Sequence, residues 1–131
     1  MKNKIIVVAA AIIKDRRLFV ARRAAELKHG GLWELPGGKV ELGEGDETAL
    51  KREIREELSL AIRVHEFIAE SEVELSERII HMRVYRCSVE DLTCLQCSDH
   101  SEVLWIQKSE LLNLAWAPAD IPILDALSDL L

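Results

Sequence analysis

The sequence is poor in cysteine, the residue that small disulfide-bonded or zinc-bound domains need. It has 3 cysteines in 131 residues. Cys94 and Cys97 form a single Cys-x-x-Cys pair, and Cys87 stands alone. A structural zinc ion needs four ligands, and no second pair is present. We therefore interpret the cysteines as reduced, incidental thiols and expect a cytoplasmic protein.

Basic residues are also too few for a broad positive surface. Lys and Arg number 17 against 23 Asp and Glu, so the formal net charge is -6. This balance argues against binding to long nucleic acids. A small anionic substrate is still compatible with it, because a bound metal ion inverts the local sign of the charge.

No apolar run is long enough to cross a membrane. The run from Ile5 to Ile13 follows Lys2 and Lys4 and resembles a short signal sequence, but a spanning helix needs about 20 residues. A charged turn and a second apolar run follow it directly. We interpret it as a buried strand and expect no membrane partner.

What the chain does have is the composition and patterning of one globular domain, residues 1–131. Hydrophobic residues make up 49% of it, and the length is enough to bury a core. The patterning predicts a strand hairpin over 4–23, a helix ending near 58 and a long hairpin over 61–88 that turns at 75–77. It also predicts a loop over 89–102, a strand over 103–106, a helical turn capped by Ser109 and a last helix over 118–131. This order favours an α/β fold with a mixed sheet between helices.

The most informative stretch lies between residues 38 and 60. Glu53, Glu56 and Glu57 are spaced i, i+3, i+4, so they share one helix face. Like charges at that spacing oppose the helix by about 0.2–0.5 kcal/mol per pair. Clustered carboxylates suit a hard divalent cation such as Mg2+, with Mn2+ as an alternative. The plain alternative is a solvated acidic face.

A neighbouring face of the same helix is apolar. Leu50, Ile54 and Leu58 follow an i, i+4, i+8 spacing and predict a stripe that packs on the core. We expect Asp46 to be the N-cap of this helix.

The whole stretch resembles the signature of the Nudix family, the Nudix box. The matching positions are Gly38, Glu44, Arg52, Glu53, Ile54, Glu56, Glu57 and Leu60. Ser59 departs from the pattern, standing where the family has glycine, at the end of the helix. Serine there is expected to cost about 1 kcal/mol of local strain.

This resemblance implies an α/β/α sandwich and a Mg2+-dependent pyrophosphohydrolase of the MutT type. It implies Glu53, Glu56 and Glu57 as metal ligands, with the backbone carbonyl of Gly37 as a further one. Arg52 is expected to orient a neighbouring carboxylate. Two points stay open: Glu44 either reaches the site through water or braces its loop, and the general base is either Glu53 or Asp99, in an acidic loop like that of MutT-type members.

The same resemblance implies a substrate site. Arg23 and Arg78 are candidates for the phosphates, with Lys39 a weaker one; the alternative is that they are surface residues. Asp120 is the candidate that contacts the base, with the Leu35 backbone and Trp116 nearby. An ionised Asp120 only accepts hydrogen bonds, which favours a base with an amine, such as cytosine or 8-oxoguanine. The alternatives are an N-cap role for Asp120 and a core position for Trp116.

The expected activity is therefore hydrolysis of nucleoside triphosphates to monophosphate and pyrophosphate, with oxidised nucleotides such as 8-oxo-dGTP as the first candidates. A CTP or modified-pyrimidine pyrophosphohydrolase is the alternative. A non-catalytic nucleotide-binding module is the rival from another class. The partner is a small nucleotide, and the sequence leaves monomer and homodimer equally open.

Overall fold

A mixed β-sheet forms the centre of the molecule. The computed structural model describes residues 2–96 and 100–131. The strands are β1 (Asn3–Lys14), β2 (Arg17–Arg23), β3 (Trp33–Glu34), β4 (Gly37–Lys39), β5 (Ile62–Glu74), β6 (Arg78–Val89) and β7 (His100–Ile106). Their order is β3-β2-β1-β6-β5, with β4 paired to β1 and β7 paired to β2. The β1–β6 pair is parallel and the other pairs are antiparallel.

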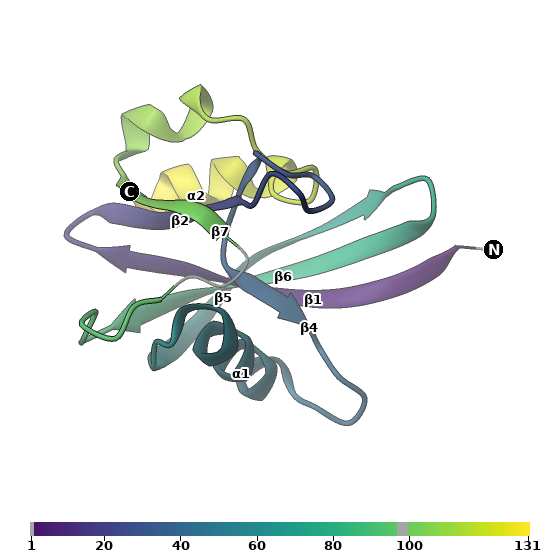
Figure 1. The fold of residues 1–131 in the computed structure, drawn as a ribbon, viewed down its shortest axis with the longest axis horizontal. Helices are drawn as coiled ribbons and strands as arrows, with labels where there is room; N and C mark the ends of the chain where they lie inside the picture. The colour runs from purple at the N-terminus through teal and green to yellow at the C-terminus, as the bar shows by residue number, and fades with distance from the viewer. Residues whose placement is uncertain (1, 97–99) are drawn as a thin grey trace.

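Helical segments cover both sides of this sheet. Helix α1 (Asp46–Leu58) lies on one side, and η1 (Lys108–Asn113), η2 (Ile121–Ile123) and α2 (Leu124–Leu130) gather on the other (Figure 1). The expected α/β/α arrangement is therefore confirmed. None of the helices in the described part of the chain combines the length and the apolarity needed to cross a membrane.

Strand β1 builds the cores on both sides of the sheet. Successive side chains of a strand point to opposite faces. Ala10 and Ile12 accordingly belong to the buried cluster under α1, whereas Ala9 and Ala11 belong to the cluster on the opposite face. This double burial explains why the run is apolar at nearly every position, as predicted for a strand covered on both faces.

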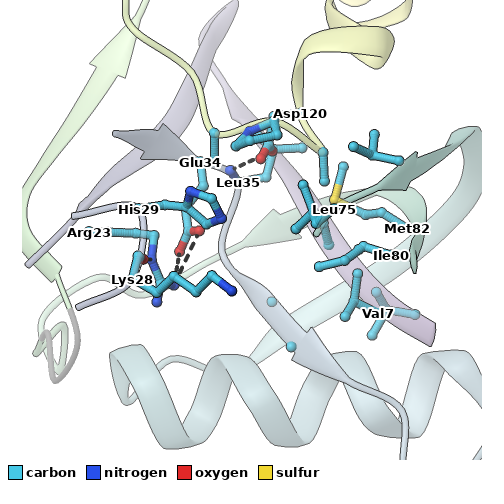
Figure 2. Close-up of a pocket in the computed structure, with 18 of the residues that line it drawn as sticks. Val7, Arg23, Lys28, His29, Glu34, Leu35, Leu75, Ile80, Met82 and Asp120 are labelled. Atoms are coloured by element: carbon cyan, nitrogen blue, oxygen red, sulfur yellow. Dashed lines mark hydrogen bonds and ion pairs between the residues drawn. The ribbon is translucent and has the colours of Figure 1, made fainter. Parts of the chain in front are cut away.

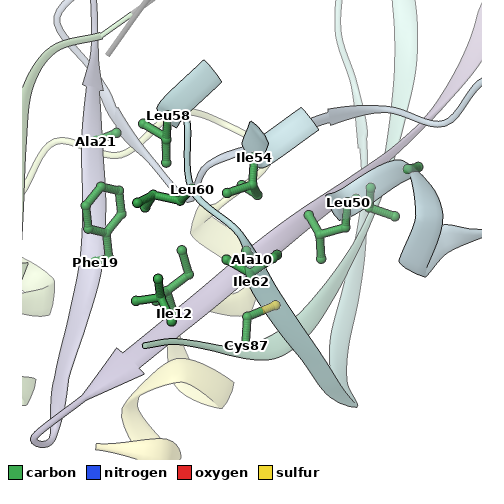
Figure 3. Packing of buried hydrophobic residues seen from close by; sticks show 13 residues of the cluster. Ala10, Ile12, Phe19, Ala21, Leu50, Ile54, Leu58, Leu60, Ile62 and Cys87 are labelled. Atoms are coloured by element: carbon green, nitrogen blue, oxygen red, sulfur yellow. The ribbon is translucent and has the colours of Figure 1, made fainter. Parts of the chain in front are cut away.

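Helix α1 buries the predicted apolar stripe. Leu50, Ile54 and Leu58 are fully buried against β1 and Phe19 of β2 (Figure 3). Because the stripe fixes the rotation of the helix about its axis, it also decides which way the glutamates on the neighbouring face point.

The prediction for the start of α1 was wrong by one residue. Gly45 occupies the N-cap position and Asp46 is the first helical residue. The Asp46 carboxylate accepts hydrogen bonds from Arg83 Nη1 at 2.9 Å and from the Tyr85 hydroxyl at 2.6 Å, both on β6. A charge-assisted bond to another element is stronger than a local cap, so Asp46 ties the helix start to the sheet instead.

Three other boundaries also differ from the prediction. The last helix is shorter than 118–131, because a turn precedes η2 and α2; Pro118 and Pro122 have no N–H to donate. Gln107, not Ser109, caps the helical turn, through a capping box with Glu110. Strand β7 begins at His100 rather than at 103, since its pairing with β2 extends through polar residues. The long hairpin turning at 75–77 is confirmed.

Ser59 ends α1 in the left-handed conformation that a glycine would favour. Its φ and ψ are 56° and 32°, and its N–H donates to Arg55 O at 3.0 Å. The structure therefore confirms that the departure from the Nudix box falls at a position with positive φ.

We predict that Ser59→Gly stabilises the protein by up to about 1 kcal/mol, because glycine adopts this conformation without strain from a Cβ atom. Urea unfolding measures the change. Ser128→Gly, inside α2, is the matched control and is expected to destabilise, since the helix interior disfavours glycine. Equal effects at the two positions would contradict strain at Ser59.

Candidate active site

The site begins where α1 touches the backbone of β4. A Cβ atom added to Gly38 would lie 2.3 Å from both Cδ and Oε2 of Glu53. Such a distance is impossible for real atoms, so only glycine lets the Glu53 carboxylate approach the strand. The next glycine, Gly37, lies equally close to β1, where an added Cβ would be 2.0 Å from Val8 O. The Gly38 contact places the acidic face of the helix against the backbone of β4, and the Gly37 contact places β4 against β1.

Arg52 organises the carboxylates around it. Its Nε and Nη2 donate to the two oxygens of Glu44 at 2.8 and 2.9 Å, and its Nη1 donates to Glu53 Oε1 at 2.9 Å. Nη1 also lies 3.4 Å from Glu56 Oε2, and Nη2 donates to the Lys39 carbonyl at 3.0 Å. These are the contacts expected of a residue that orients neighbouring carboxylates.

Glu44 is tied to its own loop. Besides Arg52, it accepts a hydrogen bond from the Glu41 backbone N–H at 3.0 Å. The Arg52 hydrogen bond, with help from the Glu41 backbone, lowers the pKa of Glu44 to about 2. Of the two roles left open for Glu44, these contacts favour bracing of the loop.

The three glutamates of the acidic face differ in their surroundings. Glu57 lines a cavity, Glu53 rests on Gly38, and the side chain of Glu56 is 60% exposed. Among the residues that the structure describes, no group of three or more His, Cys, Asp or Glu side chains is gathered closely enough to hold a metal ion. The chemistry of the donors nevertheless fits a hard divalent cation, because all three side chains offer carboxylate oxygens from one helix face.

A cavity of about 200 Å³ extends from this acidic face across the sheet (Figure 2). Glu57, Gly37 and Gly38 line its end near α1. Arg23, Lys28, His29 and Glu34 line one side, and Asp120 lies at the far end. The remaining wall is apolar and comes mainly from β1, β6 and the end of β5: Val7, Val73, Leu75, Ile80 and Met82. The cavity thus joins an acidic end, a basic flank and an apolar slot.

The two candidate arginines both reach this cavity. Arg78 lines it from the start of β6. Arg23 lines it from the end of β2, donates through Nε to the Lys28 carbonyl at 2.8 Å, and lies 3.4 Å from both oxygens of Glu34. The third candidate, Lys39, has an exposed side chain and is not among the described residues that line the cavity.

Asp120 is a buried acid at the far end of the cavity. It is 3% exposed, and its Oδ1 accepts a hydrogen bond from the Leu35 backbone N–H at 3.1 Å. Burial raises its pKa to about 8. Burial therefore favours the protonated carboxyl, which both donates and accepts, over the ionised acceptor that the sequence interpretation considered. Asp120 occupies the N-cap position of η2, but its side chain makes no capping bond within the described residues; the Leu35 backbone, which was expected nearby, donates to it instead.

Trp116 belongs to the core and not to the cavity. It is buried, its Nε1 donates to the Leu111 carbonyl at 2.7 Å, and it is absent from the described residues that line the cavity. Of the two positions considered for Trp116, the structure supports the core. Asp99, the candidate general base in the acidic loop, lies outside the described residues.

The sequence interpretation missed three residues that line the cavity: Lys28, His29 and Glu34. Glu34 carried a usable signal, because it is a lone acid between Trp33 and Leu35, two apolar residues of a strand-like run. Lys28 and His29 carried none, because they lie in a loop whose path is set by contacts with Arg23.

The fold and this site define a Nudix hydrolase. Residues 3–127 match the model of the NUDIX domain family, so the chain belongs to that family and is a MutT-like member of it. Divalent metal ions are the general cofactors of such hydrolases.

Two similar proteins of this family are a CTP pyrophosphohydrolase and a putative 8-oxo-dGTP diphosphatase. The chain is 43% identical over 121 residues to a CTP pyrophosphohydrolase of Escherichia coli, covering 92% of this chain and 88% of the relative. It is 36% identical over 122 residues to a putative 8-oxo-dGTP diphosphatase 2 of Mycobacterium tuberculosis, covering 88% and 82%.

Solved structures agree with this assignment. The solution structure of the E. coli ORF135 protein matches with a TM-score of 0.83 and 42% identity, over 98% of this chain and 91% of that one. The crystal structure of a MutT protein from Methanosarcina mazei also gives a TM-score of 0.83, with 26% identity and coverages of 98% and 94%.

We predict that Gly38→Ala reduces hydrolysis at least about tenfold, because the new Cβ must displace the Glu53 carboxylate. Gly45→Ala is the matched control: an added Cβ there meets nothing within 4 Å, and φ is −81°. Steady-state hydrolysis and thermal unfolding of both variants are compared. If the two substitutions reduce activity equally, the Glu53–Gly38 contact is not required.

We also predict that the free energy of unfolding of Asp120→Asn, relative to that of the wild type, increases as pH rises. The raised pKa means that the folded state binds the Asp120 proton more tightly than the unfolded state, where the value is near 3.8. The contribution of Asp120 to stability is thus complete below about pH 4, is lost as pH rises to about 8, and is constant above. Urea unfolding from pH 4 to 9 measures the difference, and a difference that does not change with pH would contradict the burial of this acid.

Proposed function

We propose that the protein hydrolyses nucleoside triphosphates to a monophosphate and pyrophosphate with Mg2+ as its cofactor. The carrying observation is the continuity of the cavity, which has Glu57 and Gly37 at one end, Arg23 and Arg78 along it and Asp120 at the other. A nucleoside triphosphate has the same order of parts: a phosphate chain that needs cations, then a sugar and a base.

Glu53, Glu56, Glu57 and the Gly37 carbonyl would hold the metal in this proposal. When bound, the metal neutralises charge on the phosphate oxygens and acidifies a water molecule. Arg52 keeps Glu53 in place through the 2.9 Å bond, and Arg23 and Arg78 bind phosphate oxygens. Lys39 plays no part in binding here.

The reaction breaks one phosphoanhydride bond. The water oxygen bonds to one phosphorus of the α–β phosphoanhydride, and the bond from that phosphorus to the bridging oxygen breaks. The bridging oxygen leaves with the electron pair, and the products are the nucleoside monophosphate and pyrophosphate. The proton of the water passes to a general base, which is Glu53 or Asp99. The position of the Glu53 carboxylate against Gly38, beside the cavity, supports Glu53 in this role, and Asp99 stays the alternative.

Two substrates fit the Asp120 end of the cavity. A protonated carboxyl offers a donor and an acceptor side by side. Cytosine presents an amine next to a ring acceptor, and 8-oxoguanine presents N7–H next to O6, whereas unoxidised guanine presents two acceptors, N7 and O6, at that edge. Oxidised purine nucleotides such as 8-oxo-dGTP and, as the second candidate, CTP are therefore the proposed substrates. Nucleotides of this kind also support a cytoplasmic location.

We predict that wild-type protein with Mg2+ releases pyrophosphate from 8-oxo-dGTP or CTP at least about tenfold faster than from dGTP, since the mismatch leaves a buried polar group unpaired. The measurement is pyrophosphate release across a nucleotide panel that also includes ADP-ribose. Equal rates on all nucleotides would defeat the proposal that Asp120 contacts the base.

Glu57→Gln tests the catalytic part of the proposal separately. We expect it to lower turnover by at least about a hundredfold while nucleotide binding persists, because it removes a charged ligand of the metal. Glu47→Gln, on the same helix and bound only to Lys51 at 3.1 Å among its described contacts, is the control and should leave turnover unchanged. If wild type and Glu57→Gln both bind nucleotide and neither hydrolyses it, the protein is a non-catalytic nucleotide-binding module.

A further inference from the structure

A β-bulge brings a buried histidine behind the basic flank of the cavity. Strands β2 and β7 pair regularly until Arg22 meets Glu102, and then the register shifts so that Arg23 lies opposite His100. Ser101 is the extra residue of this bulge. A one-residue shift reverses the sheet face to which the following side chains point. The bulge therefore determines the face of the sheet on which the His100 side chain lies.

His100 uses this position to hold a residue of the cavity wall. Its side chain is 1% exposed, and its Nε2 lies 2.9 Å from Glu34 Oε2. We assign the hydrogen to Nε2, so that His100 donates to the Glu34 carboxyl oxygen. Glu34 stands on β3, whose partner is β2, so the bond spans the three strands β7, β2 and β3.

The contact of Glu34 with Arg23 is long by comparison. Arg23 Nη1 is 3.4 Å from each Glu34 oxygen, whereas charge-assisted N–H···O bonds are typically about 2.7–2.9 Å. The shorter hydrogen bond to His100 therefore holds Glu34 in the cavity wall, and N–H groups of Arg23 remain available to bind another anion. Figure 2 shows Arg23 and Glu34 side by side at the edge of the cavity.

We propose that His100 is a positioning residue: its hydrogen bond holds Glu34 back from Arg23, so that the guanidinium of Arg23 remains available to the phosphates of the substrate. Without this donor, Glu34 closes on Arg23 as a short bidentate ion pair, which the substrate must break before it binds. The inference rests on the proposed function, because it takes Arg23 as a phosphate ligand.

A double-mutant cycle tests the proposal. His100→Leu is expected to raise both KM and the dissociation constant of a non-hydrolysable triphosphate analogue with Mg2+ by about tenfold, with kcat changed less than about twofold. His100→Gln retains an N–H donor near the Nε2 position and is expected to stay within about threefold of wild type. In a Glu34→Gln background, His100→Leu is expected to change binding by less than about twofold, since no carboxylate remains to close on Arg23.

His65→Leu is the matched control. His65 also makes one side-chain hydrogen bond, with Ser88 Oγ at 2.8 Å. It lies exposed on β5, away from the cavity. Replacing His65 by leucine should therefore change neither KM nor kcat. Thermal unfolding is recorded for every variant. If His100→Leu does not fold, His100→Asn replaces it, because the shorter amide does not reach Glu34.

Two results would overturn the proposal. One is an equal effect of His100→Leu with and without the Glu34 carboxylate; the other is a fall in kcat with unchanged binding, which would mean that His100 acts on the reaction step. The binding measurement also separates this inference from the proposed function. If the wild type binds the analogue but hydrolyses no triphosphate, only the proposed enzymatic function is refuted, and the double-mutant cycle can still be interpreted from binding. If the wild type does not bind the analogue, both the proposed function and the role of His100 are refuted.

Discussion

The site depends on one guanidinium group placed among acids. Arg52 holds both oxygens of Glu44 and one oxygen of Glu53, and it lies close to Glu56. Carboxylates crowded on one turn of a helix repel one another, and a fixed cation on the same turn offsets that repulsion. Since Glu44 lies in the loop before the helix, the same contacts also fix the loop to the helix. The acidic face can therefore persist at the surface of a stable domain.

The sheet fixes the position of helix α1, which carries these acids. Strand β1 buries alternate side chains against α1 and against the opposite layer, so it cannot shift without disturbing both cores. Gly37 and Gly38 of β4 pair with β1, and Gly38 lies against the Glu53 carboxylate. Helix α1 is thus positioned by core packing through Leu50, Ile54 and Leu58, and by contact with a glycine backbone that carries no side chain. Asp46 adds a third attachment, to Arg83 and Tyr85 on β6.

The cavity places groups of opposite character at its ends, and this suits a substrate with a charged and an uncharged half. Burial raises the pKa of Asp120 to about 8, which favours its uncharged form at the far end of the cavity. In the loop before α1, the Arg52 hydrogen bond lowers the pKa of Glu44 to about 2. The pKa values of Asp120 and Glu44 therefore shift in opposite directions, because Asp120 is buried among apolar atoms and Glu44 is paired with a guanidinium.

Local sequence determined the elements whose signals are periodic and short in range. The spacing of Leu50, Ile54 and Leu58 predicted the packed face of α1, the spacing of Glu53, Glu56 and Glu57 predicted its acidic face, and the apolar run predicted β1, because helix and strand periods depend only on neighbouring residues. Tertiary structure alone decided what long-range contacts control. Asp46 bonds to β6 rather than capping its helix. The pKa of Asp120 is raised because distant segments bury it, and His100 meets Glu34 because a bulge shifts the pairing of β2 and β7. Burial, charge state and strand register arise from atoms far apart in the chain, and no local pattern records them.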